Sequence, residues 1–279
     1  MKTGVFIFDT DYSIDIRELA PALEERGFES LFLPEHTHIP TSRISPWGDG
    51  STPLPPEYSH THDPFVALSF AAAVTTNLKL GTGICLIPQR DPIVTAKSVA
   101  SLDMMSDGRF IFGIGGGWNV EEMNDHGAEY KTRFKLLRER VLAMKALWTE
   151  EEASFDGEMV KFGPSWSYPK PTQKPYPPVV LGGETIHTLR RVVEFCEGWF
   201  PRATPKFDPT VAMARLKAVA DDAGRDMASL SVSVFRAPPD ASELDRYEDA
   251  GITRALFGLP SADRDTVLKL LDEYAPLVR

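Results

Sequence analysis

Two histidines stand close together near the start of the sequence, in the run Glu35-His36-Thr37-His38. Imidazole changes its charge near neutral pH, which suits it to donate or accept a proton in a reaction. The preceding residues, Ser30–Leu33, predict a short buried strand that Pro34 stops. His36 therefore follows directly on a strand, and this position fits a catalytic residue and a polar loop histidine equally well.

A pair of glycines interrupts the next predicted strand, in Gly81-Thr82-Gly83-Ile84-Cys85. Glycine weakens a buried strand, so it usually marks a bulge or a place where a ligand or another backbone comes close. The pattern fits a packing kink as well as a ligand contact.

Two further glycine runs follow later predicted strands. Gly113-Ile114-Gly115-Gly116-Gly117-Trp118-Asn119 forms a loop of the kind that exposes backbone amides to anions or flat rings. No helix is predicted to begin there, so the run is not a dinucleotide-binding fingerprint. Leu181-Gly182-Gly183-Glu184-Thr185 leads straight into a predicted helix, whose free N–H groups and dipole suit a phosphate. A flexible loop and a tight strand–helix turn are the alternatives for these two runs.

The histidines are also compatible with a metal site, which is an alternative to the catalytic role. Two His-Thr-His triplets occur, at 36–38 and 60–62, and neutral imidazole is a common metal ligand. A metal-dependent barrel hydrolase would need ligands at later strands too, but the sixth and eighth predicted strands end in Trp199-Phe200-Pro201 and Phe257-Gly258-Leu259. The glycine runs with one histidine favour instead a flat, phosphorylated, flavin-like ligand, and we predict no metal.

The elements that must position these residues alternate along the chain. Eight runs typical of strands are each followed by a helical stretch, and they are Val5–Phe8, Ser30–Leu33, Lys79–Cys85, Arg109–Gly113, Pro178–Leu181, Gly198–Phe200, Leu230–Phe235 and Arg254–Phe257. Strict alternation predicts parallel strands with crossover helices, here one α/β domain over 1–279 folded as a closed (β/α)8 TIM barrel. The alternative, an open doubly wound sheet, would place a glycine-rich turn where the sequence has Asp9-Thr10-Asp11.

Local signals mark the ends of several predicted helices. Ser13 is expected to cap the first helix, and Asp63-Pro64 and Asp91-Pro92 to begin the second and third, because proline suits the first helical position. Two stretches without periodicity, 37–62 and 150–178, are predicted to be irregular insertions at the C-terminal mouth of the barrel, where the functional residues of such barrels lie.

Composition excludes several classes of protein. The 279 residues carry a formal charge of −10, which disfavours nucleic acid and anionic membranes as partners. No apolar run reaches the roughly 18 residues of a membrane-spanning helix, and the N-terminal run turns acidic too early for a signal peptide. The two cysteines, Cys85 and Cys196, exclude a disulfide framework. We therefore expect a reduced, cytoplasmic protein.

Four runs of the sequence resemble the luciferase-like monooxygenase superfamily, and most closely its deazaflavin branch, the enzymes that use coenzyme F420. They are Thr61–Phe65, Leu80–Ile84, Ser101–Phe110 and Gly113–Glu122. The resemblance covers residues 1–200 well. It implies a barrel with the cofactor at the C-terminal mouth under an insertion, a homodimer, and transfer of a hydride between C5 of the deazaflavin and a small organic substrate.

The resemblance also implies roles for particular residues. His36 carries the proton-transfer role of similar enzymes, although this sequence has Glu35 where they have aspartate. Gly83-Ile84 matches their non-proline cis peptide. The expected cofactor contacts are His36, Gly83, Ile84, Cys85, Gly115, Gly116, Gly117, Asn119, and the phosphate-binding Gly182, Gly183, Glu184 and Thr185.

Substrate contacts are less well defined. Asp9, Trp47 and Trp118 are the expected ones, and Arg43 is a candidate partner for the anionic tail of the cofactor. Aromatic residues of the two insertions fit an apolar pocket and loop packing equally. FMN with a two-component monooxygenase activity is the main alternative to F420, and a non-catalytic flavin carrier is a further one.

Overall fold

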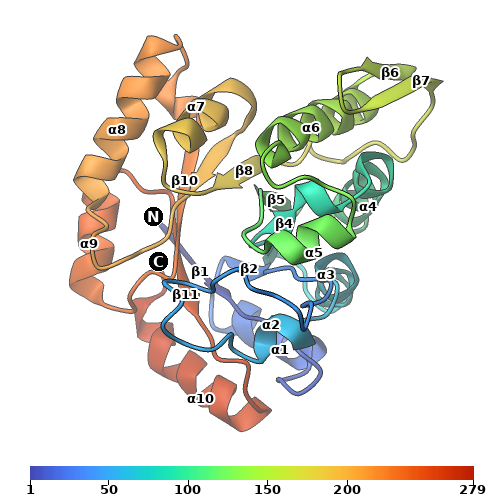
Figure 1. Ribbon diagram of the computed structural model, residues 1–279. Helices are drawn as coiled ribbons and strands as arrows, with labels where there is room; N and C mark the ends of the chain where they lie inside the picture. Colours follow the sequence, from blue (N-terminus) through green and yellow to red (C-terminus); the bar gives the residue numbers. More distant parts are fainter.

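The computed structural model describes all of residues 1–279, and its centre is a closed barrel of eight parallel strands (Figure 1). These strands are β1 (Lys2–Phe6), β2 (Ser30–Leu33), β3 (Lys79–Thr82), β5 (Phe110–Gly115), β8 (Val179–Gly182), β9 (Gly198–Phe200), β10 (Ser231–Phe235) and β11 (Arg254–Gly258). The short strand β4 (Cys85–Leu86) follows β3 after a break. The predicted (β/α)8 barrel is confirmed.

Two pairings close the ring. β1 pairs in parallel with β11, with Val5 opposite Phe257, and β3 pairs with β5, with Leu80 opposite Phe110. An open doubly wound sheet would leave two edge strands, so this alternative is wrong.

Helices surround the barrel (Figure 1). The helices that connect successive barrel strands, or close the chain, are α1 (Ile16–Glu25), α3 (Pro64–Ala73), α4 (Pro92–Met105), α6 (Arg133–Thr149), α7 (Ile186–Phe195), α8 (Pro209–Asp222), α9 (Ala241–Asp249) and α10 (Arg264–Tyr274). Shorter helical segments are α2 (Glu57–His60), α5 (Val120–Asp125) and the 3-10 turns Ile87–Gln89, Met227–Ser229 and Ala275–Leu277.

Aspartate carboxylates cap most of the connecting helices. Asp63 and Asp91 each accept hydrogen bonds from the first turn of a helix that begins with proline, as predicted. The prediction for Ser13 is wrong, because Asp15 caps α1 by accepting from the Arg17 amide at 2.8 Å. Ser13 instead donates to the Thr10 carbonyl in the preceding turn.

Apolar side chains form two layers around the strands. The inner layer fills the barrel with Phe6, Phe32, Ile111, Val180, Phe200 and Leu256. The outer layer, a cluster of 56 buried residues, packs the opposite faces of the strands against the helices. This alternation fixes which side chains point into the barrel, so the strand ends form a rigid support for loops that bind ligands.

The insertion at 150–178 differs from its prediction. It contains an antiparallel hairpin, β6 (Ala153–Asp156) and β7 (Lys161–Ser165), which lies on α6, away from the barrel mouth (Figure 1). The chain then passes the N-terminal ends of the barrel strands. There Gln173 contacts Asp103 near the end of α4, and Tyr176 contacts Glu197 before β9. It therefore does not cover the mouth as the resemblance implied.

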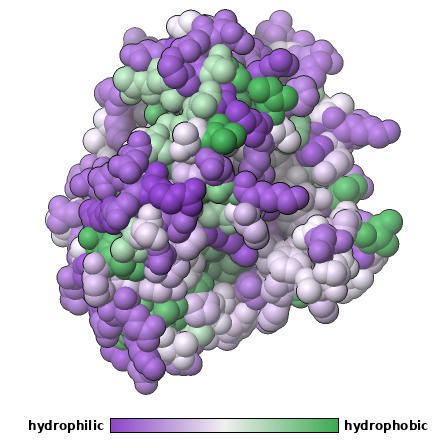
Figure 2. Space-filling view, turned by 90° about the vertical axis from the view of Figure 1, so that its left-hand side faces the viewer, coloured by the Kyte–Doolittle hydropathy of each residue, from purple (hydrophilic) through white to green (hydrophobic).

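The face carrying α8, α9 and α10 is predominantly hydrophilic, with apolar side chains in separate groups (Figure 2). No helix is both long enough and apolar enough to span a bilayer.

Candidate active site

A cleft of about 400 Å³ opens at the C-terminal ends of the strands between β4 and β10. This volume is typical of small-molecule sites. Among the residues named from the sequence, those that line it are Gly83, Ile84, Gly115, Gly116, Gly117, Trp118, Gly182, Gly183, Glu184 and Thr185. The three glycine runs, far apart in the sequence, thus meet in one cleft.

Gly115 allows β5 to pass close to the side chain of Ile84. A Cβ atom at position 115 would lie 1.8 Å from Cδ1 of Ile84, so a larger residue fits only if the Ile84 side chain moves. The Gly83-Ile84 peptide is cis, as the resemblance implied. Ile84 also contacts the backbone at Gly182, where a Cβ atom would lie 3.5 Å from its Cγ2 atom. Ile84 therefore forms an apolar floor between two glycine runs.

The turn between β8 and α7 supplies free backbone donors. Gly183 has φ of +123°, a conformation that favours glycine, and its carbonyl accepts a hydrogen bond from Trp199 Nε1 at 2.7 Å. Thr185 caps α7. No backbone carbonyl accepts from the N–H groups of residues 184–187, so they are free to bind an anion at the helix N-terminus.

These walls fit a flavin-type cofactor. Ile84, Phe134 and Phe200 provide apolar contacts for a flat ring, and the start of α7 provides donors for a phosphate. A Cβ atom at Gly116 would lie 2.7 Å from the Phe134 ring, so the backbone and this ring are also closely packed. The cleft therefore combines an apolar slot with an anion-binding end.

His36 forms a buried pair with Glu122. Its Nδ1 atom lies 2.8 Å from Glu122 Oε2, and both side chains are shielded from solvent. The other carboxylate oxygen accepts from the Thr37 amide at 3.2 Å. Since a carboxylate only accepts, the pair orients the ring and leaves Nε2 without a partner in the protein.

His36 lies beside the cleft rather than in its wall. The Trp118 ring lines the cleft and its centre is 5.8 Å from that of His36. The Tyr58 ring centre lies 5.1 Å from that of His36 and 6.3 Å from that of Trp118. These rings surround the imidazole and separate it from bulk water.

Glu35 has a structural partner of its own. Its buried carboxylate accepts from the Leu86 amide at 2.6 Å and forms an ion pair with Arg90. Burial lowers the pKa of Arg90, but the charge and hydrogen bond of Glu35, with the neighbouring Cys85 and Asp63, together raise it. Glu35 therefore links the end of β2 to the segment that follows the cis peptide, through Leu86 and Arg90.

Besides His36, two expected cofactor contacts lie outside the cleft wall. Cys85 is fully buried in the outer core, and this burial raises the pKa of its thiol. Asn119 is also fully buried and caps α5, because its Oδ1 accepts from the Glu122 amide at 3.3 Å. A helix does begin after this glycine run, contrary to the prediction.

Two expected substrate contacts also lie apart from the cleft. The nearly buried Asp9 contacts His62, with Oδ2 and Nδ1 2.9 Å apart, and borders a separate hollow beside α1 and α3. Burial raises the pKa of Asp9, although His62 opposes this shift. Trp47 packs edge-on against Tyr58, with ring centres 5.9 Å apart. Of the three expected substrate contacts, only Trp118 lines the cleft.

The two His-Thr-His triplets do not converge. His36 contacts Glu122, and the other three histidines contact different aspartates, His38 with Asp125, His60 with Asp11 and His62 with Asp9. No group of three or more His, Cys, Asp or Glu side chains is arranged to hold a metal ion. The donor geometry therefore gives no support to the metal-dependent hydrolase.

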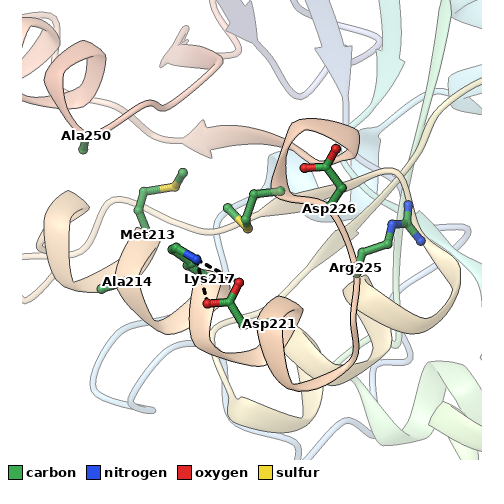
Figure 3. A pocket seen from close by; sticks show the side chains of 8 residues that line it. Met213, Ala214, Lys217, Asp221, Arg225, Asp226 and Ala250 are labelled. Carbon is green, nitrogen blue, oxygen red and sulfur yellow. Dashed lines mark hydrogen bonds and ion pairs between the residues drawn. The ribbon is translucent and has the colours of Figure 1, made fainter.

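A second hollow, of about 410 Å³, lies on the outside of the barrel along α8 (Figure 3). Its charged groups are bonded to other protein groups: Lys217 Nζ lies 2.6 Å from Asp221 Oδ2, and Arg225 donates to the Cys196 carbonyl at 3.0 Å. It therefore lacks free groups that could take part in chemistry.

The fold and the cleft together define a barrel oxidoreductase with room for a flavin-type cofactor. The family model of the luciferase-like monooxygenases matches residues 2–257, so the chain belongs to this family. An uncharacterized protein of Mycobacterium tuberculosis is 39% identical over 282 residues, which cover 99% of this chain and 98% of that protein.

Proteins with stated activities are also similar. An F420-dependent glucose-6-phosphate dehydrogenase of Gordonia bronchialis is 32% identical over 183 residues, covering 62% of this chain and 48% of the dehydrogenase. The structure of an F420-dependent tetrahydromethanopterin reductase from Methanopyrus kandleri has a TM-score of 0.76 at 18% identity, covering 99% and 98% of the two chains, and shares the fold. The chain is an oxidoreductase of the luciferase-like class, whose cofactors are deazaflavins or flavins.

Proposed function

We propose that the protein is an F420-dependent oxidoreductase that transfers a hydride between C5 of the deazaflavin and a small organic substrate. The observation that carries this proposal is the meeting of three glycine runs in one cleft beside the His36–Glu122 pair. The similarity to an F420-dependent dehydrogenase supports F420 rather than FMN.

The residues of the cleft have separate tasks in this proposal. The free amides after Gly182 and the start of α7 bind the phosphate. Ile84 and Phe134 hold the flat ring between apolar surfaces and exclude water from it. When bound, F420 supplies a hydride donor or acceptor at C5, and the protein contributes mainly position and a dry environment.

His36 handles the proton that accompanies the hydride. Glu122 accepts the hydrogen bond of Nδ1–H, so Nε2 is the nitrogen that gives a proton to the substrate or takes one from it. Trp118 lines the cleft beside the imidazole and contributes to the substrate space.

A binding titration tests the choice of cofactor. Purified protein is titrated with F420 and, under anaerobic conditions, with reduced FMN, and both affinities are measured by fluorescence. The proposal predicts at least tenfold tighter binding of F420. Tight binding of reduced FMN with no affinity for F420 would instead assign the protein to the flavin monooxygenases of the family.

A further inference from the structure

Two arginines lie together where α6 and α7 begin, next to the cleft. Arg133 is the first residue of α6, and Arg191 lies in the second turn of α7. Their guanidinium carbons lie 4.5 and 4.2 Å from the centre of the same ring, that of Phe134. Arg133 and Phe134 line the cleft, so this cationic pair is continuous with it.

Neither arginine has a carboxylate partner. Arg133 donates to the Tyr130 carbonyl at 2.7 Å, but its Nε atom is buried without an acceptor. Arg191 makes no hydrogen bond or ion pair within the protein. Further along α6, Arg138 donates to Glu194 of α7 at 2.7 Å, so the nearest carboxylate of α7 is already engaged.

The two charges disfavour each other. Burial lowers the pKa of Arg191, the neighbouring charge of Arg133 lowers it further, and the charge of Glu194 opposes this shift without reversing it. A protein gains nothing in stability from two such cations held together without an anion, since like charges repel and partial burial removes hydration. An anionic ligand between them would relieve both costs.

The position of Arg191 relates the pair to the phosphate site. Thr185, Thr188 and Arg191 are spaced three residues apart, so they follow one face of α7 from its N-terminus. Thr185 and Thr188 line the cleft. Arg191 therefore lies one turn beyond the amides that face the phosphate, in the seam between α6 and α7.

We propose that Arg133 and Arg191 bind the carboxylate tail of the cofactor, the part of F420 that extends beyond its phosphate. FMN ends at its phosphate, so this contact makes the site selective for F420. The inference rests on the proposed function. Arg43, the tail partner considered from the sequence, lies over the Trp118 ring and donates to the Ser45 carbonyl, away from this seam.

A fluorescence titration without substrate compares three ligands and so separates the contributions of tail, phosphate and ring to the affinity. The ligands are F420 with its glutamate tail, the form that ends at the lactyl phosphate, and the chromophore without phosphate. Wild-type protein is expected to bind full F420 about tenfold or more tightly than the tail-free form, and high salt should reduce this preference. Arg191→Met should weaken full F420 about tenfold and leave the other two ligands unchanged, and Arg133→Met should weaken full F420 by at least as much.

Arg138→Met is the matched control, because it removes the same charge from the same seam but from an arginine already paired with Glu194. It should not change any of the three affinities. Arg191 lies outside the cleft wall, so its variant tests the tail contact without altering the ring site, and melting temperatures verify that each variant is folded.

The outcomes distinguish this inference from the function on which it rests. If wild-type protein binds no form of F420, the proposed function is wrong, and this inference is wrong with it. If wild-type protein binds F420 and both variants bind it equally well, or lose affinity for full and tail-free forms alike, only the tail assignment is overturned.

Discussion

The Nδ1 atom of His36 lies 2.8 Å from the Oε2 atom of Glu122, although 86 residues separate them in the sequence. His36 follows β2, and Glu122 lies in the first turn of α5, directly after the glycine loop of the cleft. The same loop therefore carries the backbone that lines the cleft and the carboxylate that orients the histidine. The proposed hydride and proton transfer depends on this coupling between cofactor site and proton donor.

Removal of the imidazole tests its role. His36→Ala should fold normally and lower turnover roughly 10²–10⁴-fold, the usual contribution of a general acid–base group. Steady-state rates with F420 and a melting curve measure the two effects. Unchanged turnover would show that His36 is only a neighbour of the ring.

Glu122→Gln keeps the size of the side chain but removes the charge that holds Nδ1–H. Turnover should fall roughly tenfold to a hundredfold, a part of the contribution of His36 itself, while F420 affinity stays the same. Asp125→Asn is the matched control, because it removes the corresponding carboxylate from the exposed His38 pair on the same helix. Equal effects of the two variants would contradict a special role for Glu122.

The packing of Gly115 against Ile84 predicts a large effect from one methyl group. In Gly115→Ala the added Cβ would start 1.8 Å from Ile84 Cδ1, so Ile84 must move. We expect a loss of roughly 1–3 kcal/mol in unfolding free energy, as for overpacked cores, together with weaker cofactor binding. Gly163→Ala, with no atom within 4 Å of its added Cβ, should change neither quantity.

The sequence predicts the barrel well because the signals for its elements are local. Ser30–Leu33 is an apolar run, and Asp63-Pro64 marks a helix start through contacts within one turn. The glycine runs are also recognisable locally, and the barrel brings their strand ends together. Cys85, expected at the cleft, is buried in the core, because a residue beside a bulge points to the core or to the cleft according to the backbone path.

The His36–Glu122 pair had no comparable signal in the sequence. Its formation depends on where α5 begins, and Asn119 sets this point through a cap directly after a glycine run where no helix was predicted to begin. The hairpin β6–β7 was missed for a related reason. Most of its side chains are not buried, so the apolar alternation that identifies a strand is absent.

Acid should release the loop that follows β2. Glu121 accepts hydrogen bonds from the amides of Ile44 and Ser45. Bonds from the Ser45 side chain and these amides lower the pKa of Glu121 to about 2, from its usual value of 4.5. Because the folded-state pKa is depressed, this anchor is fully present above pH 4.5 and is lost as the pH falls toward about 2.

Hydrogen exchange at the Ile44 and Ser45 amides measures this release. Protection should be constant above pH 5 after correction for intrinsic exchange and should decline below pH 4.5, whereas Glu121→Gln should show low protection throughout. Equal protection in the two proteins at neutral pH would show that another contact holds the loop.

Anaerobic turnover tests the central claim most directly. Wild-type protein is mixed with reduced F420 and a panel of small carbonyl and enone compounds without oxygen, and with reduced FMN in the presence and absence of oxygen, while cofactor absorbance is followed. We predict oxidation of F420 that depends on substrate, needs no oxygen and is lost in His36→Ala. Turnover only with reduced FMN and oxygen would contradict it.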